Sequence, residues 1–295
     1  MRIPADRPGS NLLLSCALVA ALGLWPLCVG AAGEKAVPGM EPSSRDLLTV
    51  VTLPPEESAR NHIIYFPKLL ALALSKTEAT DGPFEILPYP RLLTGARFLA
   101  KLEKGDGLDV VWTMTNPDLE KSLLRIPVSL LRGLNSHRAL LIRAEDQSKF
   151  DEVRSLEDLK KFRGAMVSHW PDTAILEHNG LPVETSAHYE LMFSMLEAKR
   201  VDYFPRGLYE VWQEQQMHAE DGLAVEQSLM LYYHGPIYFF VNRSNKALAD
   251  RIERGLRIAM DDGSFDELFF SIPGFKRGYD EIAKGKRRIF ELPLP

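Results

Sequence analysis

Residues 107–143 read GLDVVWTMTNPDLEKSLLRIPVSLLRGLNSHRALLIR, and this stretch decides the class of fold. The apolar run at 109–112 predicts a buried strand, which ends in a polar Thr-Met-Thr-Asn-Pro turn. A second apolar run, at 139–142, follows a turn around Gly133. Small hydroxyl groups therefore stand at the carboxyl end of a buried strand, and in open α/β sheets ligands bind at that edge.

Strand-like and helix-like patterns alternate on the amino-terminal side of this stretch. They are expected at 47–53 (strand), 61–75 (helix), 84–87 (strand), 92–102 (helix) and 109–112 (strand). A β-α-β-α-β order needs right-handed crossovers and a mostly parallel sheet. The first part of the chain is therefore predicted to form one α/β lobe.

A second α/β series follows the strand expected at 139–143. It begins at 155–158, where a serine N-cap precedes an acidic first helical turn. Further elements are expected at 165–167 (strand), 173–178 (helix), 187–200 (helix), 201–204 (strand), 208–218 (helix), 232–241 (strand) and 245–261 (helix). The sequence thus predicts an α/β protein with two lobes, joined where the chain leaves the first lobe and where it returns.

The first 32 residues have the pattern of an export signal. Arg2 and Arg7 precede an apolar run at 12–29, and Val29-Gly30-Ala31 fits the small-x-small cleavage rule. A single membrane anchor is the alternative, because about 18 apolar residues are at the short limit for crossing a bilayer. A signal is favoured, since small and helix-breaking residues interrupt the run, and it predicts a periplasmic protein.

Composition narrows the classes of function. Both cysteines, Cys16 and Cys28, fall in the predicted signal, so the exported chain would have no disulfide and no cysteine-based metal site. The formal net charge is −5, and removal of the signal, which carries +1, leaves about −6. A negative chain is a poor partner for nucleic acid or an anionic membrane surface. A small soluble ligand is the expected partner.

The stretch around Thr113 resembles bacterial extracellular solute-binding proteins of family 3. Members have a "DV/DL…T-x-T" strand end and an "F-S-x-P-Y" segment, and Thr113, Met114, Thr115 and Pro127 stand at the matching places. The segments WPDT at 170–173 and DYFPRG at 202–207 also match a subfamily of transporter substrate-binding domains. The resemblance implies a type II periplasmic binding fold that captures a small ligand between two lobes, for a transporter or a sensor.

The resemblance also implies domain boundaries. It places the helices at 245–261 and 264–271 on the first lobe. The expected parts are a signal peptide (1–32), a linker (33–44), the first part of lobe 1 (45–142), lobe 2 (143–236), and a return to lobe 1 with the C-terminal tail (237–295). The last 20 residues carry six basic side chains, which we interpret as a solvated surface, with a docking role as the alternative.

Two positions depart from the family pattern. Asp118 stands where members have an arginine that grips the ligand's carboxylate, and Gly207 stands where they have an acid for its amino group. Arg206 is expected just beyond the strand at 201–204, where its guanidinium could replace the missing anchor, with Tyr203 or Phe204 as an apolar wall. The alternative is an arginine paired with Glu210 one helical turn on.

Other candidate ligand contacts come from the strand ends and the turns beside them. Asp172 or Thr173 could cap a helix and expose amide donors to an anion. Trp170 could stack on a planar or cationic ligand, or pack between the lobes. Trp112 faces the same choice, with a core position favoured. The full set of predicted ligand contacts is Trp112, Thr113, Thr115, Arg138, His169, Trp170, Asp172, Thr173, Tyr203 and Arg206.

Catalytic and cofactor motifs are missing from the sequence. None of the seven histidines forms a pair with metal-ligand spacing, and there is no Gly-x-Ser-x-Gly elbow, P-loop or dinucleotide fingerprint. We therefore expect a monomeric binding protein without cofactor or metal, for a small anionic or zwitterionic ligand. Two alternatives stay open: a docking or sensor partner with a degenerate site, and a dehydratase-like enzyme that uses Asp118 or Asp172.

Overall fold

The computed structural model describes residues 46–54, 61–91 and 95–295. The predicted signal peptide, the predicted linker, both cysteines and residues 92–94 of the helix predicted at 92–102 lie outside the described residues. Within the described ranges, no helix combines the length and the apolar character that crossing a membrane requires.

The first sheet is five-stranded and mixed. It is built from β1 (Leu48–Thr52), β2 (Phe84–Pro88), β3 (Val110–Met114), β4 (Leu123–Arg125) and β11 (Ile237–Asn242). The order is β2-β1-β3-β11-β4, with β1 parallel to β2 and β3, and β11 antiparallel to β3 and β4. The predicted parallel β-α-β-α-β start is confirmed, and β11 brings the chain back into this sheet.

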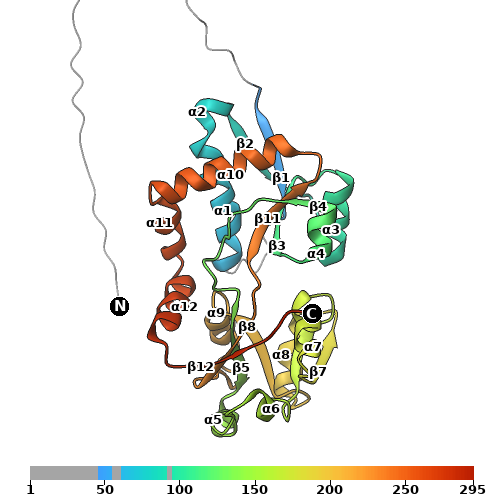
Figure 1. Cartoon of the computed structure of the whole chain (residues 1–295), viewed down its shortest axis with the longest axis vertical. Coiled ribbons are helices and arrows are strands. Elements are labelled where there is room, and N and C mark those ends of the chain that lie inside the picture. The colour runs from blue at the N-terminus through green and yellow to red at the C-terminus, as the bar shows by residue number, and fades with distance from the viewer. Residues whose placement is uncertain (1–45, 55–60, 92–94) are drawn as a thin grey trace, which may run out of the picture. The chain divides into compact units, whose positions relative to one another are not determined.

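Six helices accompany the first sheet. They are α1 (Asn61–Lys76), α2 (Glu78–Asp81), α3 (Gly95–Lys104), α4 (Pro117–Ser122), α10 (Lys246–Asp261) and α11 (Ser264–Phe270). α10 runs across α1, as Figure 1 shows, and α11 also packs on α1. On the other side, α3 and α4 bury Leu102 and Leu119 in a small cluster with Val111 and Phe240.

The second sheet is seven-stranded. Its strands are β5 (His137–Arg143), β6 (Gly164–Val167), β7 (Val183–Ser186), β8 (Tyr203–Gly207), β9 (Leu223–Val225), β10 (Leu229–Tyr232) and β12 (Arg288–Glu291). The order is β12-β10-β5-β8-β6-β7, and β9 pairs with β5. The accompanying helical segments are η1 (Ala144–Asp146), α5 (Gln147–Asp151), α6 (Leu156–Leu159), α7 (Pro171–His178), α8 (Glu190–Glu197), α9 (Val211–Met217) and α12 (Pro273–Lys284).

Local signals in the second series are partly confirmed. Ser155 caps α6 in a reciprocal capping box with Asp158, as its sequence predicts. α7 ends at His178, before Asn179 and Gly180, whose φ of 72° suits glycine. The helix predicted at 187–200 is shorter, because α8 covers only Glu190–Glu197. The exposed strand β7 has no counterpart in the prediction.

The boundaries between the two sheets differ from the predicted ones. The strand expected to close lobe 1, at 139–142, is β5 and belongs to the second sheet. The single strand expected at 232–241 is two strands in different sheets, β10 and β11, separated by residues 233–236. The break falls at Gly235-Pro236, a pair that interrupts regular structure.

The C-terminal tail forms a third crossing that the sequence analysis did not predict. We expected 237–295 to return to lobe 1, but β12 lies parallel to β10 at the edge of the second sheet. α12 packs on α9, and Gly278 allows this approach, because an added Cβ there would lie 2.5 Å from the carbonyl oxygen of Leu208. The tail thus leaves the first sheet after α11 and ends on the second (Figure 1).

A close helix contact predicts a sensitive position at Gly255 on α10. A Cβ at this position would lie 1.9 Å from the carbonyl oxygen of Ala73 on α1, and backbone atoms cannot give way as a flexible side chain can. We expect Gly255→Ala to lower the free energy of unfolding by about 2 kcal/mol, because overpacking outweighs the ~1 kcal/mol that alanine adds as a helix former. Urea unfolding measures it.

Asp250→Ala is the matched control for Gly255→Ala, since Asp250 is exposed on the same helix. Its free energy of unfolding should stay within about 0.5 kcal/mol of the unchanged protein. Equal effects of the two substitutions would contradict the close approach of α1 and α10.

Candidate functional site

Arg138 lies at the start of β5, buried where the chain passes between the sheets. Its Nη2 pairs with Asp172 Oδ1 at 2.6 Å, and its Nε donates to the Tyr233 hydroxyl at 2.7 Å. Nη1 donates to Asn135 Oδ1 at 2.8 Å. Burial alone would lower the pKa of Arg138, but Asp172, with smaller contributions from Tyr233, Tyr209 and Glu210, raises it above its usual value. The guanidinium is fully engaged inside the protein.

Asp172 reaches Arg138 from the first turn of α7. Its Oδ1 takes both the ion pair with Arg138 and a short hydrogen bond from the Tyr233 hydroxyl. Its Oδ2 has no hydrogen-bond partner among the described residues. It is also not among their fully buried polar atoms without a partner, so it keeps some exposure to solvent. Since 11% of the side chain is exposed, one carboxylate oxygen faces solvent while the other is held.

Two chain crossings are tied together beside this pair. Asn135 Nδ2 donates to the carbonyl of Gly235 at 2.5 Å, and the Gly235 amide donates to Ser136 Oγ at 3.1 Å. Gly235 lies close to the end of β3, because an added Cβ would lie 2.8 Å from Met114 Sδ and that flexible side chain would have to shift. Arg138 Nη2 also contacts that sulfur at 3.8 Å. Met114, at the end of β3 in the first sheet, therefore contacts Arg138, the partner of Asp172.

Arg206 lies within β8 and not beyond its end, which corrects the predicted position. The strand extends to Gly207, with Arg206 opposite Ala139. Only 4% of Arg206 is exposed, and the Glu214 carboxylate holds Nε at 2.6 Å and Nη2 at 2.7 Å. Glu210, the predicted alternative partner, is paired too, at 2.9 Å. This pairing is buried, whereas the alternative assumed a surface pair.

Aromatic rings surround the Arg206 guanidinium. Its Cζ lies 4.9 Å from the ring centre of Trp170, 5.2 Å from that of Tyr189 and 4.7 Å from that of Phe204. Burial would lower the pKa of Arg206, but Glu210 and Glu214 raise it well above the usual value. Trp170 is half-buried in this stack and contacts a cation of the protein itself, so its predicted roles, stacking on a ligand or packing between the lobes, stay predictions.

Tyr203 does not share a site with Arg206. Side chains alternate along a strand, so Tyr203 points to the opposite face of the sheet from Phe204 and Arg206. It packs edge-on against Phe150 and under Gly164, and its hydroxyl has no hydrogen-bond partner among the described residues. Burial raises the pKa of the Tyr203 hydroxyl. Of the two residues predicted as an apolar wall, Phe204 lies beside Arg206 and Tyr203 does not.

The remaining candidates are divided between internal and open positions. Trp112 stacks on Phe66 with ring centres 5.1 Å apart, which is the core position the sequence favours. Thr115 Oγ1 donates to Glu120, and Thr173 Oγ1 donates to the carbonyl of Val167. Neither Asp172 nor Thr173 caps α7, because Trp170 stands at the N-cap position and its side chain makes no cap bond.

Thr113 and His169 keep open polar groups. Thr113 is half-buried on β3, and its hydroxyl has no recorded partner among the described residues. His169 is exposed in the turn before α7. Open polar groups that remain on the predicted edge are therefore Asp172 Oδ2, the Thr113 hydroxyl and the His169 ring.

The sequence analysis missed Glu214, Tyr233 and Asn135 as partners of the two arginines. Glu214 had a readable signal, since it lies three residues after Val211 on the buried face of α9. A carboxylate on an apolar helix face requires a partner. Asn135 and Tyr233 lie in crossing segments, where no periodicity reports which side chains meet.

One group of possible metal ligands comes together outside this site. Ligand atoms of Glu197, His218 and Asp221 lie within 4.8 Å of one another. His218 Nδ1 already bonds to Asp221 at 2.8 Å, and the ring stacks on Phe193. Glu197 and Asp221 are exposed. The geometry is that of a surface His-Asp pair.

Comparison with known proteins defines the fold. No family model matches the chain, and no curated protein does. A solved ancestral arginine-binding protein bound to glutamine matches 77% of this chain and 98% of its own length, with TM-score 0.57 and 18% identity. A histidine kinase sensor domain similar to periplasmic binding proteins matches 78% of this chain and 96% of its own, with TM-score 0.56 and 14% identity.

A third solved structure matches to a similar degree. It is an ancestral amino acid-binding protein, a precursor of cyclohexadienyl dehydratase, which matches 77% of this chain and 95% of its own, with TM-score 0.54 and 16% identity. The chain therefore has the two-lobed type II periplasmic binding protein fold that the sequence analysis predicts. These neighbours include binding proteins, one of them an ancestral precursor of an enzyme, and a sensor domain, so the fold does not decide the function.

The Arg206 network predicts a stability effect at Glu214. Removing this carboxylate leaves a buried guanidinium with Glu210 alone, and breaking a buried ion pair costs roughly 3 kcal/mol of unfolding free energy. We expect Glu214→Ala to show that loss in urea unfolding at pH 7. Glu220→Ala, an exposed glutamate just after α9, should change the same free energy by less than about 0.5 kcal/mol. Similar losses in both variants would contradict the buried network.

Proposed function

We propose that this chain is an exported solute-binding protein that captures a small zwitterionic, amine-bearing ligand between its lobes. The observation that carries the proposal is the half-open Asp172 carboxylate. Arg138 and Tyr233 hold Oδ1, which fixes the position of Oδ2 at the edge where β3 meets the second sheet. A preoriented carboxylate oxygen is a suitable acceptor for a ligand ammonium group.

The charges around the site support an amine. Arg138 and Asp172 cancel, while Arg206 faces two carboxylates, Glu210 and Glu214, so these five groups carry a net charge of about −1. Asp172 would supply the acid that family members have at the position where this chain has Gly207. The solved neighbours are described as bound to arginine or glutamine, and both ligands carry an α-ammonium group.

The same charges argue against a purely anionic ligand. Arg138 and Asp172 both come from elements of the second sheet, and so do Arg206, Glu210 and Glu214. Rotation of one lobe against the other would not separate these partners. The ligand's carboxylate would therefore meet neutral donors, of which the Thr113 hydroxyl and the His169 ring are the candidates, with Trp170 beside them.

The delivery partner is proposed to be an inner-membrane transporter or a sensor. The solved neighbours include transporter binding proteins and a histidine kinase sensor domain. A dehydratase-like activity has less support: Asp172 is ion-paired with Arg138, and Asp118 is exposed and paired with Lys121. General acid–base catalysis needs a carboxyl group that can exchange its proton with substrate.

The proposal predicts that binding depends on the ligand's amine. We expect arginine or glutamine to raise the unfolding midpoint of the unmodified protein, whereas the matching acids without the α-amino group do not. A ligand at 100 times its dissociation constant adds about 2.7 kcal/mol to the free energy of unfolding. Thermal unfolding with a panel of amino acids and their deaminated analogues makes this measurement on one sample.

Two substitutions locate the amine contact. Asp172→Asn should weaken binding at least tenfold in calorimetry, because a charged hydrogen bond is replaced by a neutral one. Asp118→Asn, at an exposed carboxylate, should leave the affinity unchanged. Binding of the deaminated analogues with equal affinity would refute the amine proposal. Silence toward every compound would favour the docking or sensor partner with a degenerate site.

A further inference from the structure

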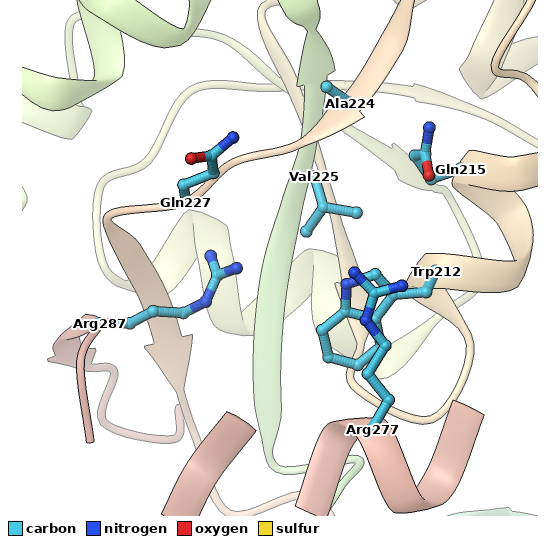
Figure 2. A pocket seen from close by; sticks show the side chains of 7 residues that line it. All are labelled: Trp212, Gln215, Ala224, Val225, Gln227, Arg277 and Arg287. Carbon is cyan, nitrogen blue, oxygen red and sulfur yellow. The ribbon is translucent and has the colours of Figure 1, made fainter. Parts of the chain in front are cut away.

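A hollow of about 290 Å³ lies away from the candidate site, between α9, the end of β9 and the C-terminal tail. Figure 2 shows its side chains, with Arg277 of α12 and Arg287 on opposite sides of Val225. Two arginines and two glutamines line it and no carboxylate does, so its lining carries a formal charge of +2. This volume is at the small end of the range for ligand pockets.

The two arginines differ in how their charge is balanced. Arg287 is almost buried, and its Nε pairs with Glu281 Oε1 at 2.9 Å, with Glu226 Oε2 3.8 Å from its Nη1. Arg277 has no hydrogen bond or ion pair with any described residue. Its guanidinium lies over the ring of Trp212, with Cζ 4.7 Å from the ring centre (Figure 2). The charge at this end of the hollow is therefore unmatched.

Most of the other basic residues of the tail have a partner, and Lys286, which has none among the described residues, is exposed to solvent. Lys276 pairs with Asp280, Lys284 pairs with Glu281, and Arg288 donates to the carbonyl of Val153. Burial lowers the pKa of Arg277, and the nearby Glu281 offsets this only in part. The Arg277 guanidinium is stacked on Trp212 and has no carboxylate partner. Such a group is stabilised most by an oxyanion that accepts hydrogen bonds from two of its nitrogens.

The remaining lining suits a small ligand with one charged end. Gln215 Nε2 already donates to the carbonyl of Leu223 at 3.2 Å, but the Gln227 side chain has no recorded partner among the described residues. Val225 supplies an apolar wall between the arginines. Trp212 is buried, so it fixes the plane of the Arg277 guanidinium.

We propose that this hollow binds a small oxyanion, a carboxylate or a phosphate, on the Arg277 guanidinium. The ligand's charged end lies against Arg277 and the Gln227 amide, and its body lies on Val225. Occupancy links α12 to α9 and the β9 end, which are otherwise joined by packing. This site is separate from the Asp172 site and does not depend on the proposed function.

The test titrates the full exported protein with succinate and, separately, with inorganic phosphate, at constant ionic strength in calorimetry. We expect saturable binding of one or both probes, and the stronger probe identifies the oxyanion. Arg277→Gln, which keeps a polar side chain but removes the charge, should weaken that binding about tenfold or more. Lys276→Gln is the matched control, because it removes a neighbouring exposed charge that is paired with Asp280.

Two outcomes would overturn the proposal. One is the absence of saturable binding by either probe. The other is an equal loss in Arg277→Gln and Lys276→Gln, which would mean nonspecific attraction to a basic surface. Arg277→Gln should bind arginine or glutamine as the unmodified protein does, so failure of this site and failure of the amine-binding function are distinguishable.

Discussion

The ion pair between Arg138 and Asp172 is the interaction on which the arrangement of this protein depends. A buried guanidinium without a counter-charge would cost several kcal/mol, so Asp172 has to remain within reach of it. This requirement fixes the start of α7 against β5. Through Tyr233 and Asn135, it also fixes the two segments that carry the chain between the sheets. The strand end at Met114 then closes on the same pair.

The second network repeats this principle with an excess of acid. Arg206 is enclosed by Glu210, Glu214 and three aromatic rings, all on elements of the second sheet. Charges arranged in this way belong to one lobe, whatever the other lobe does. The edge proposed for ligand binding therefore keeps its electrostatic character when the lobes move. The open charged group there is an acidic oxygen of Asp172, because both arginines are paired within the second lobe.

Much of this fold was predictable from the sequence, and the site was only partly so. Alternating periods predicted the first sheet, and the segments around Thr113 and Asp172 predicted the edge where the lobes meet. Arg206 was misplaced because strand 201–204 continues through Pro205 to Gly207, where proline obscures the strand pattern. The partners Glu214 and Tyr233 join Arg206 and Arg138 across 8 and 95 positions. No local pattern carries information over the longer of these separations.

The third crossing changes what the two lobes can do. The two connections that lie side by side, at 126–136 and 233–236, would act together as one hinge. The third connection, through α12, is separate, and it ends in β12, which is hydrogen-bonded to β10. Only Ser271 and Ile272 lie between α11, which packs on α1, and α12, which packs on α9. Any large movement of the two lobes apart would have to bend the chain at these two residues or break the hydrogen bonds between β12 and β10. How far the lobes can separate is therefore limited by residues near 271–291, far in sequence from Thr113 and Asp172 of the proposed site.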